Sequence, residues 1–159
     1  MKQNNGWLLV DKHIGVTSRE IVNKISKCLT ERKVGHAGTL DPMASGLLAV
    51  AVGEATKSIF VMQNMIKVYE FKVRWGFSTT TDDIEGSVLS VSSIRPTKNE
   101  IAKSLPELIG NIKQIPPNFS AIKINGVRSY KLARQNKEID HKPRVVKIHD
   151  LKYKKYINK

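Results

Sequence analysis

The chain has 159 residues and carries 27 Lys and Arg against 14 Asp and Glu, which gives a formal net charge of +13. This length suits one domain with a hydrophobic core, and an apolar content of 40% argues against a chain that is disordered by composition. One cysteine excludes a disulfide framework, four histidines without HxH or HxxxH spacing argue against a metal site, and no apolar run reaches the ~18–20 residues of a membrane span.

The first half of the sequence predicts strands and helices around a glycine-rich loop. Thr17 and Glu20 have the spacing of a capping box, and apolar residues at helical spacing follow them. Residues 35–42 contain two glycines and a proline, which predicts an extended loop. The expected elements are a strand at 7–10, a helix from 17 to about 30, a buried strand at 46–52, a helix at 54–65 and a half-buried strand at 67–76.

The second half predicts shorter elements. They are a weak strand at 87–92, a helix from 97 that Pro106 kinks or shortens, a strand at 119–124 before a tight turn at 125–126, helical turns at 130–135, and an extended segment at 145–156. Strands and helices interleave without a strict βαβ rhythm. The pattern therefore predicts an α+β fold (mixed α/β) with a mixed or mostly antiparallel sheet.

The positive charge is uneven along the chain. Residues 1–81 hold 11 basic and 6 acidic residues (net +5), residues 82–112 hold 3 and 5 (net −2), and residues 113–159 hold 13 and 3 (net +10). Clustered positive charge is typical of proteins that bind a polyanion, most often nucleic acid. A solvated surface rich in lysine is an equal alternative, because charge alone does not separate the two.

Three segments could carry chemistry, and each has a plainer interpretation. In the glycine-rich loop, Asp41 could act as a nucleophile or general base, or could simply start an Asx turn before Pro42. Residues 79–86 combine hydroxyls and acids that could bind a substrate hydroxyl or a metal, or form a polar hairpin loop. Residues 114–134 form either a rigid basic ridge for phosphates and bases or an ordinary hairpin and basic helix.

Read together, four long segments in order resemble the TruB family of tRNA pseudouridine synthases. The family patterns GxxxxDKPxGxTS, GHxGxLDPxAxGxL, KxYxxxxxxGxxTxTxDxxG and QxPPxxSAxKxxGxRxYxxAR correspond to GWLLVDKHIGVTS at 6–18, GHAGTLDPMASGLL at 35–48, KVYEFKVRWGFSTTTDDIEG at 67–86 and QIPPNFSAIKINGVRSYKLAR at 114–134. Agreement over four long ordered motifs is far more specific than a match to one short motif.

The resemblance implies a pseudouridine synthase fold, a mostly antiparallel central sheet flanked by helices. The implied enzyme is an isomerase that converts a T-loop uridine of tRNA, position 55, to pseudouridine by exchanging the C1′–N1 bond for a C1′–C5 bond. It implies no cofactor and no metal. The expected partner is tRNA, with no membrane and with a monomeric state, and the expected location is the cytoplasm.

The resemblance also assigns roles to individual residues. Asp41 matches the catalytic aspartate, which attacks or deprotonates the nucleoside, and Tyr69 matches the tyrosine that stacks on the flipped uracil. His36 matches a histidine that fills the space left in the T-loop, and Asp83 matches an acid near the base. Lys12 belongs to a motif that supports the pocket beside the active-site tyrosine, and with His36, Tyr69 and Asp83 it is expected to bind the substrate. The expected contacts with the RNA backbone are Lys123, Arg128, Lys131 and Arg134.

The sequence departs from the family in its length. Family members continue beyond the equivalent of Lys159 into a KGTYIR-type motif, whose Arg pairs with the catalytic Asp, and into a PUA domain. We therefore expect residues 1–159 to form a partial catalytic domain that is incomplete at its C-terminus and has no PUA domain. The alternative to a truncated synthase is a catalytically incomplete tRNA-binding remnant.

A second departure is His13, which stands where the family has Pro. Proline fixes φ and stiffens a loop, so His13→Pro is expected to raise stability by about 0.4–1 kcal/mol and to change turnover modestly. Thermal unfolding and a turnover assay check this. A variant with both unchanged melting temperature and unchanged turnover would contradict it.

Overall fold

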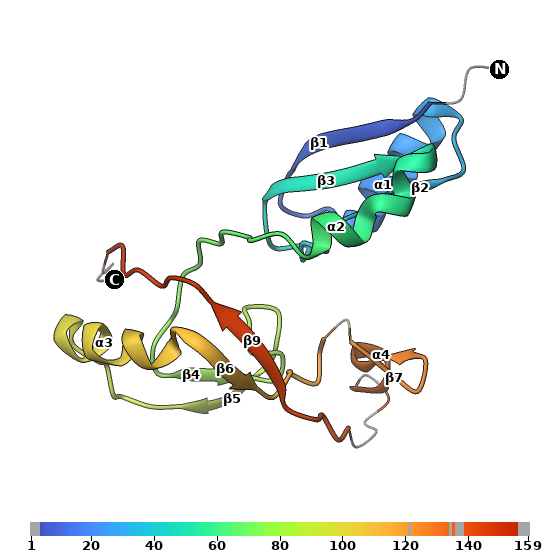
Figure 1. Ribbon diagram of the computed structural model, residues 1–159. Coiled ribbons are helices and arrows are strands. Elements are labelled where there is room, and N and C mark those ends of the chain that lie inside the picture. The colour runs from blue at the N-terminus through green and yellow to red at the C-terminus, as the bar shows by residue number, and fades with distance from the viewer. Residues whose placement is uncertain (1–3, 121, 134, 136–138, 156–159) are drawn as a thin grey trace. The chain divides into compact units, whose positions relative to one another are not determined.

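The computed structural model describes residues 4–120, 122–133, 135 and 139–155. The chain divides into two compact units, residues 1–70 and 71–159, and each is described by itself. In the first unit the elements are β1 (Gly6–Lys12), α1 (Ser18–Leu29), β2 (Val34–His36), β3 (Gly46–Val52), the 3-10 helix η1 (Gly53–Ser58) and α2 (Ile59–Gln63) (Figure 1).

The first unit is built on a three-stranded antiparallel sheet in the order β1-β3-β2. β3 lies in the centre and runs antiparallel to both neighbours, with Gly6 opposite Val52 and Lys12 opposite Gly46. Its continuous apolar sequence fits this central position, since Leu48, Val50, Ala51 and Val52 are all buried.

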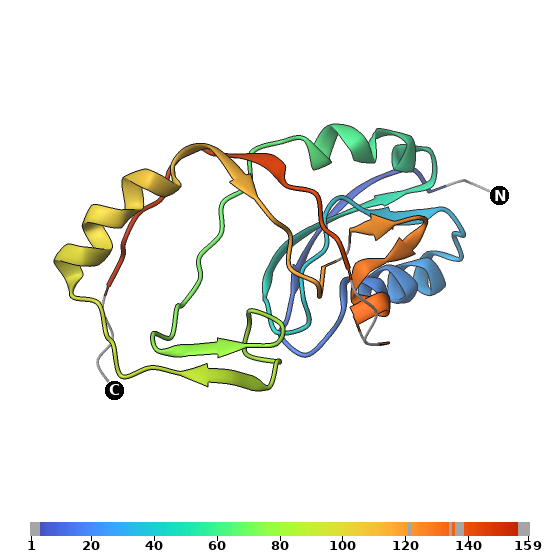
Figure 2. The same cartoon turned by 90° about the horizontal axis from the view of Figure 1, so that it is seen from below.

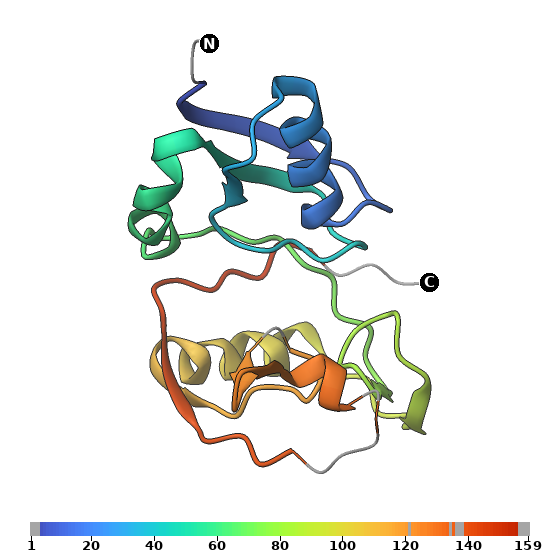
Figure 3. The same cartoon turned by 90° about the vertical axis from the view of Figure 1, so that its right-hand side faces the viewer.

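Helices lie on both faces of this sheet (Figure 3). On one face α1 packs Val22 against Leu48 and Val50, and these three residues form the core of the unit. On the other face Ile59 approaches Gly35, where an added Cβ would lie 2.8 Å from the Ile59 Cδ1 atom. Glycine at 35 therefore permits the close packing of α2 on the sheet.

Local chemistry explains where α1 begins and ends. The Thr17 hydroxyl accepts from the Glu20 N–H at 3.1 Å, and the Glu20 carboxylate accepts from the Thr17 N–H at 2.6 Å, which completes the predicted capping box. At the other end Thr30 adopts a left-handed conformation (φ 53°) that ends the helix.

An exposed ion-pair cluster joins β2 to η1. The Glu54 carboxylate pairs with Lys57 and with Lys33, the latter at 2.9 Å. Hydrogen bonds from Lys57 and then Lys33 lower the pKa of Glu54 to about 2. Glu54 is therefore ionised at neutral and mildly acidic pH.

The second unit holds β4 (Phe77–Thr79), β5 (Val88–Val91), α3 (Lys98–Ser104), the 3-10 helix η2 (Leu105–Leu108), β6 (Gly110–Gln114), β7 (Lys123–Ile124), β8 (Val127–Arg128), α4 (Ser129–Ala133) and β9 (Arg144–Ile148). Its strands form three antiparallel pairs among the described residues: β4-β5, β6-β9 and β7-β8. Figure 2 shows the β4-β5 hairpin and the longer connection through α3 to β6. No helix in the described part of the chain is long and apolar enough to cross a membrane.

The α+β fold class is confirmed, since helices combine with strands that pair antiparallel throughout the described residues. The strand at 46–52, the weak strand near 87–92 and the capped helix after residue 97 are observed as β3, β5 and α3. Pro106 ends the regular helix as expected, because α3 gives way at Leu105 to a 3-10 turn.

The predicted strand at 67–76 is wrong. This segment is not part of any sheet in the described chain, and its apolar side chains are exposed, from 37% for Trp75 to 94% for Val68. The alternation of side chains suits a strand, but a strand also requires a neighbour for its backbone hydrogen bonds. No described strand pairs with this segment, so periodicity alone is insufficient.

Two other predictions need correction. The helix at 54–65 is split into η1 and α2, and the strand at 119–124 is reduced to β7, with residue 121 outside the described residues.

β6 lies in a segment for which the sequence predicted no element, and it begins at Gly110 (φ 99°), directly after Ile109, which caps η2. Gly110 is followed by alternating residues that pair with β9.

Leu48 tests the core of the first unit. Leu48→Ala removes a side chain that is 2% exposed and is expected to destabilise the protein by about 2–5 kcal/mol, since it leaves a cavity beside Val22 and Val50. The neighbouring Leu47 is 69% exposed, so Leu47→Ala should change stability by less than about 0.5 kcal/mol. Urea unfolding followed by circular dichroism measures both. Equal effects would contradict the described core.

Candidate active site

The loop of residues 37–42 follows β2 and carries Asp41 at its surface. The Ala37 N–H donates to the Ala49 carbonyl at 2.9 Å, which ties the start of the loop to β3. After the loop, the Ala44 N–H donates to the Asp41 carbonyl at 3.0 Å and closes a turn. The Asp41 carboxylate is exposed and forms no hydrogen bond or ion pair with other described residues. The Asx-turn interpretation is therefore wrong, and the carboxylate is available for chemistry.

The segment between β1 and α1 fixes this loop from the other side. The Ser18 hydroxyl donates to the Leu40 carbonyl at 2.9 Å and accepts from the Leu40 N–H at 2.9 Å. The Gly15 N–H donates to the Pro42 carbonyl at 2.8 Å. The residues on both sides of Asp41 are thus attached to the 15–18 segment, which restricts where the carboxylate can lie.

Lys12 is a fully buried lysine at the end of β1. Its ammonium group donates to the Val16 carbonyl at 2.8 Å and to the His13 carbonyl at 3.0 Å. These bonds close the 13–16 turn, which in turn holds Pro42 through Gly15. The ammonium group therefore supports the turn that holds the Asp41 loop, and a role for Lys12 toward a substrate stays a prediction.

His36 ends β2 with its ring held in one orientation. Its Nδ1 atom lies 2.8 Å from the Gly38 carbonyl oxygen. Because a carbonyl only accepts, Nδ1 carries the proton in this bond, and Nε2 is left as the other functional atom of the ring. The ring is half-buried beside the loop that carries Asp41.

Tyr69 lies in the unpaired segment after α2, and 65% of it is exposed. Its ring presents an accessible aromatic surface. The structure gives no sheet register that would fix its direction, because the expected strand at 67–76 is absent.

Asp83 organises the loop between β4 and β5 in the second unit. Its Oδ1 atom accepts from the Thr81 hydroxyl at 2.5 Å and from the Glu85 N–H at 2.8 Å. The Thr79 hydroxyl also donates to the Asp83 carbonyl at 2.7 Å. The polar hairpin interpretation of residues 79–86 is thus correct, and a role for Asp83 toward a substrate stays a prediction.

The predicted basic ridge lies on the β7-β8 hairpin and α4. Lys123 and Arg128 are exposed and face one another across the two strands, and Lys131 is exposed on α4. Arg134 lies outside the described residues. The exposed positions suit contact with a polyanion.

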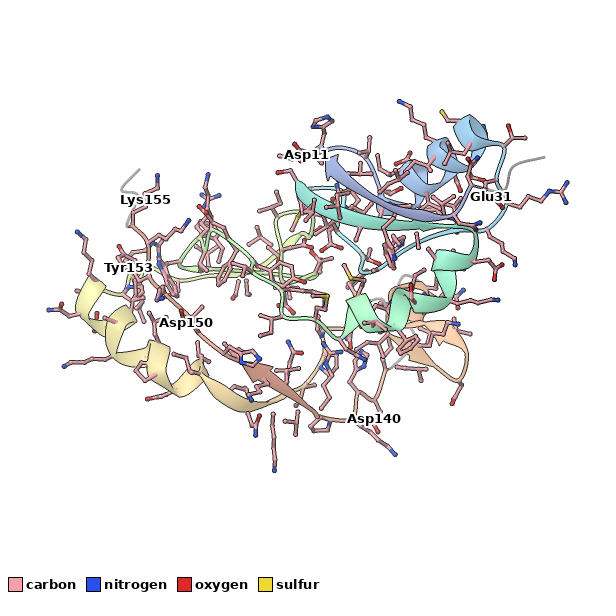
Figure 4. The ribbon with its side chains drawn as sticks, turned by 45° about the horizontal axis from the view of Figure 1, so that its top comes forward. Asp11, Glu31, Asp140, Asp150, Tyr153 and Lys155 are labelled. Atoms are coloured by element: carbon pink, nitrogen blue, oxygen red, sulfur yellow. The ribbon has the colours of Figure 1, made fainter. Side chains whose placement is uncertain are left out.

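Carboxylates are spread over each unit rather than gathered. Figure 4 shows Asp11 at the end of β1, where the 13–16 turn departs, and Glu31 beyond α1 at the other end of the first unit. In the second unit Asp140 precedes β9, whereas Asp150, Tyr153 and Lys155 follow it. Among the described residues, no three His, Cys, Asp or Glu side chains form a group that could hold a metal ion.

A family model described as TruB family pseudouridylate synthase (N terminal domain) matches residues 26–159. The chain belongs to the TruB family. It is 49% identical over 148 residues to tRNA pseudouridine synthase B of Wolbachia pipientis, covering 93% of this chain and 42% of that protein. It is 52% identical over 135 residues to tRNA pseudouridine synthase B of Roseobacter denitrificans, covering 85% and 45%. The chain thus spans about half the length of the curated relatives it matches.

The fold comparison agrees with the TruB assignment. A chain of the solved Cbf5-Nop10-Gar1 complex superimposes with a TM-score of 0.53 and 28% sequence identity. The match covers 89% of this chain and 33% of that chain. The likeness therefore includes nearly all of the present chain and a third of the solved one.

Sequence reasoning named Lys12 but did not predict that it is fully buried, and it did not single out Ser129, which is also fully buried. The Ser129 hydroxyl donates to the Asn118 carbonyl at 2.5 Å and lies 3.0 Å from the His141 Nε2 atom. Because the Ser129 proton is directed to Asn118, the His141 Nε2–H is the donor to Ser129. These bonds connect Ser129 to Asn118 and to His141.

The buried lysine gives a test of the positioning role. Lys12→Met keeps the length of the side chain but leaves the Val16 and His13 carbonyls without their charged donor, so stability should fall by about 1–3 kcal/mol. The Gly15 amide, bonded to Pro42, should exchange its hydrogen faster.

The matched control is Lys24→Met on the exposed side of α1. Urea unfolding and hydrogen–deuterium exchange measure the two effects. Unchanged protection of the Gly15 amide in Lys12→Met would show that the buried ammonium does not hold the Asp41 loop.

Proposed function

We propose that this chain carries the catalytic loop of a tRNA pseudouridine synthase that isomerises the T-loop uridine at position 55. In this reaction the C1′–N1 bond breaks and a C1′–C5 bond forms, while C5 loses its hydrogen and N1 gains one. The atoms balance without an oxidant, a reductant or a transferred group. We accordingly expect no cofactor and no metal.

The observation that carries the proposal is the exposed Asp41 carboxylate on a loop fixed on both sides. A carboxylate that makes no hydrogen bond or ion pair with the described chain can act on a nucleoside as a nucleophile or as a base. The loop is held by Ser18 and Gly15, so little reorganisation is needed when substrate binds. The curated relatives named tRNA pseudouridine synthase B support tRNA as the substrate.

The other predicted residues have complementary roles in the proposal. A uridine inside a stacked loop is unreachable, so it must flip out and rest against an aromatic surface, for which the exposed ring of Tyr69 is suited. The oriented ring of His36 fills the space left in the T-loop, and Asp83 lies near the base. Lys123, Arg128, Lys131 and Arg134 contact the RNA backbone. The protein acts as a monomer in the cytoplasm.

A second candidate is a tRNA-binding protein without chemistry. It is favoured by one observation, namely that no cation of the described chain pairs with Asp41. An aspartate without a neighbouring positive charge lacks the electrostatic support that catalytic carboxylates commonly have. The exposed basic residues of β7, β8 and α4 are compatible with binding alone.

Asp41→Asn separates the two candidates. It should lower turnover by about 10³-fold or more while tRNA affinity is retained, since the amide is neither a nucleophile nor a base. Unmodified tRNA carrying tritium at C5 of uridine reports turnover, because the C5 hydrogen is released when C5 joins C1′. Filter binding of the same tRNA reports affinity.

The control is Glu31→Gln, which removes a carboxylate at the other end of the first unit. Tritium release by the original chain that is lost in Asp41→Asn and kept in Glu31→Gln supports the synthase. Binding without tritium release by the original chain supports the second candidate. Tritium release that persists in Asp41→Asn contradicts a catalytic role for Asp41.

A further inference from the structure

Two arginines of the second unit converge on one aromatic ring. The Arg74 guanidinium carbon lies 4.1 Å from the centre of the Phe77 ring, and that of Arg95 lies 5.8 Å from the same centre. Both distances are within the range of cation–π interaction. The ring is half-buried at the start of β4, whereas both arginine residues are exposed.

The position of Arg95 is fixed by the backbone. Its Nη1 atom donates to the Ser92 carbonyl at 2.6 Å and to the Ile94 carbonyl at 2.8 Å. A Cβ at Gly76, which has a φ of 83°, would lie 1.9 Å from this Nη1 atom. The Ser92 carbonyl oxygen would lie 2.5 Å from the same Cβ, so glycine permits both the guanidinium and this backbone to lie close to residue 76.

Both guanidinium groups keep free donors. Arg74 makes no hydrogen bond or ion pair with the described residues, and Arg95 uses only Nη1. Neither forms a salt bridge with a described carboxylate. The acidic residues of this hairpin, Asp82, Asp83 and Glu85, lie in the loop at its opposite end.

We propose that Arg74 and Arg95, held on the Phe77 ring, form a binding site for a phosphate group of the RNA backbone. Both positive charges lie close to the Phe77 ring, and together they attract a phosphate anion. The planar guanidinium fork matches two phosphate oxygens, and Arg74 is free to supply it. This site adds a second point of backbone contact to the basic residues of β7, β8 and α4. The choice of RNA as the ligand rests on the proposed function.

Arg74→Gln in the full chain tests the site. The variant should weaken binding of the unmodified tRNA and of a single-stranded oligouridine alike, and should reduce the slope of log affinity against log salt by about 1. Arg74→Lys keeps the charge but not the fork, and should recover part of the loss. Lys98→Gln, which neutralises an exposed cation on α3, controls for net charge and should leave the slope unchanged.

A second measurement needs no variant. Phenylglyoxal modifies accessible arginines, and mass spectrometry reports each position. RNA should protect Arg74 and Arg95 more strongly than Arg32 of the first unit, and inorganic phosphate at the same phosphate concentration should protect them much less. If inorganic phosphate protects Arg74 and Arg95 as strongly as RNA does, the assignment of RNA as the ligand is overturned. If RNA does not change the reactivity of Arg74 and Arg95 toward phenylglyoxal, the proposed site is overturned.

The outcomes separate this inference from the proposed function. Tritium release by the original chain, together with equal salt slopes for Arg74→Gln and Lys98→Gln, overturns the phosphate site alone. RNA binding that depends on Arg74 without tritium release supports the phosphate site and contradicts the proposed catalysis.

Discussion

Hydrogen bonds between the 15–18 segment and the 37–42 loop are the constraint on which the candidate site depends. Ser18 exchanges two hydrogen bonds with the backbone of Leu40, and Gly15 holds the carbonyl of Pro42. Asp41 lies between these two attachment points. A carboxylate can remain exposed at a defined place only when the neighbouring backbone is satisfied by other partners, since a free loop would use the carboxylate as its own cap.

The buried Lys12 supports the same arrangement, although its burial removes the hydration of a charged group. Its ammonium group is removed from water, and its two bonds are to neutral carbonyls rather than to a carboxylate. Burial of a charge is unfavourable unless hydrogen bonds replace its hydration. The carbonyls of His13 and Val16 accept hydrogen bonds from this ammonium group, which fixes the 13–16 turn. The Gly15 N–H of the same turn then donates to the Pro42 carbonyl. The position of Asp41 thus depends on a buried residue of the neighbouring turn.

The sequence predicted best the features that depend on residues close together in the chain. Both capping boxes are present, and the Thr97 hydroxyl accepts from the Glu100 N–H at 3.3 Å in the second one. The apolar run of β3 is central and buried, as its composition requires. Asp41 was singled out from its motif, and the structure places it on the surface of a loop, while its catalytic role stays a prediction.

The failures concern contacts between distant residues. The alternation at 67–76 was correct as a pattern, but strand formation depends on a partner that the pattern does not specify. Ser129 is buried where its hydroxyl donates to the carbonyl of Asn118, eleven residues away, and the sequence does not indicate this contact. The Arg74–Phe77–Arg95 cluster was also missed, because Arg95 is brought to Phe77 by the pairing of β4 with β5, which places Val91 opposite Phe77.

That register separates opposite charges along one hairpin. Asp83 uses its carboxylate to order the loop at one end, while Arg95 is fixed against Gly76 at the other. At the phosphate site proposed above, the phosphate backbone of RNA is repelled by the acidic end of the hairpin and attracted by the basic end, which would orient an RNA strand as well as bind it. Phosphate contacts of this kind carry no sequence information, so selection of a nucleotide would have to come from other contacts.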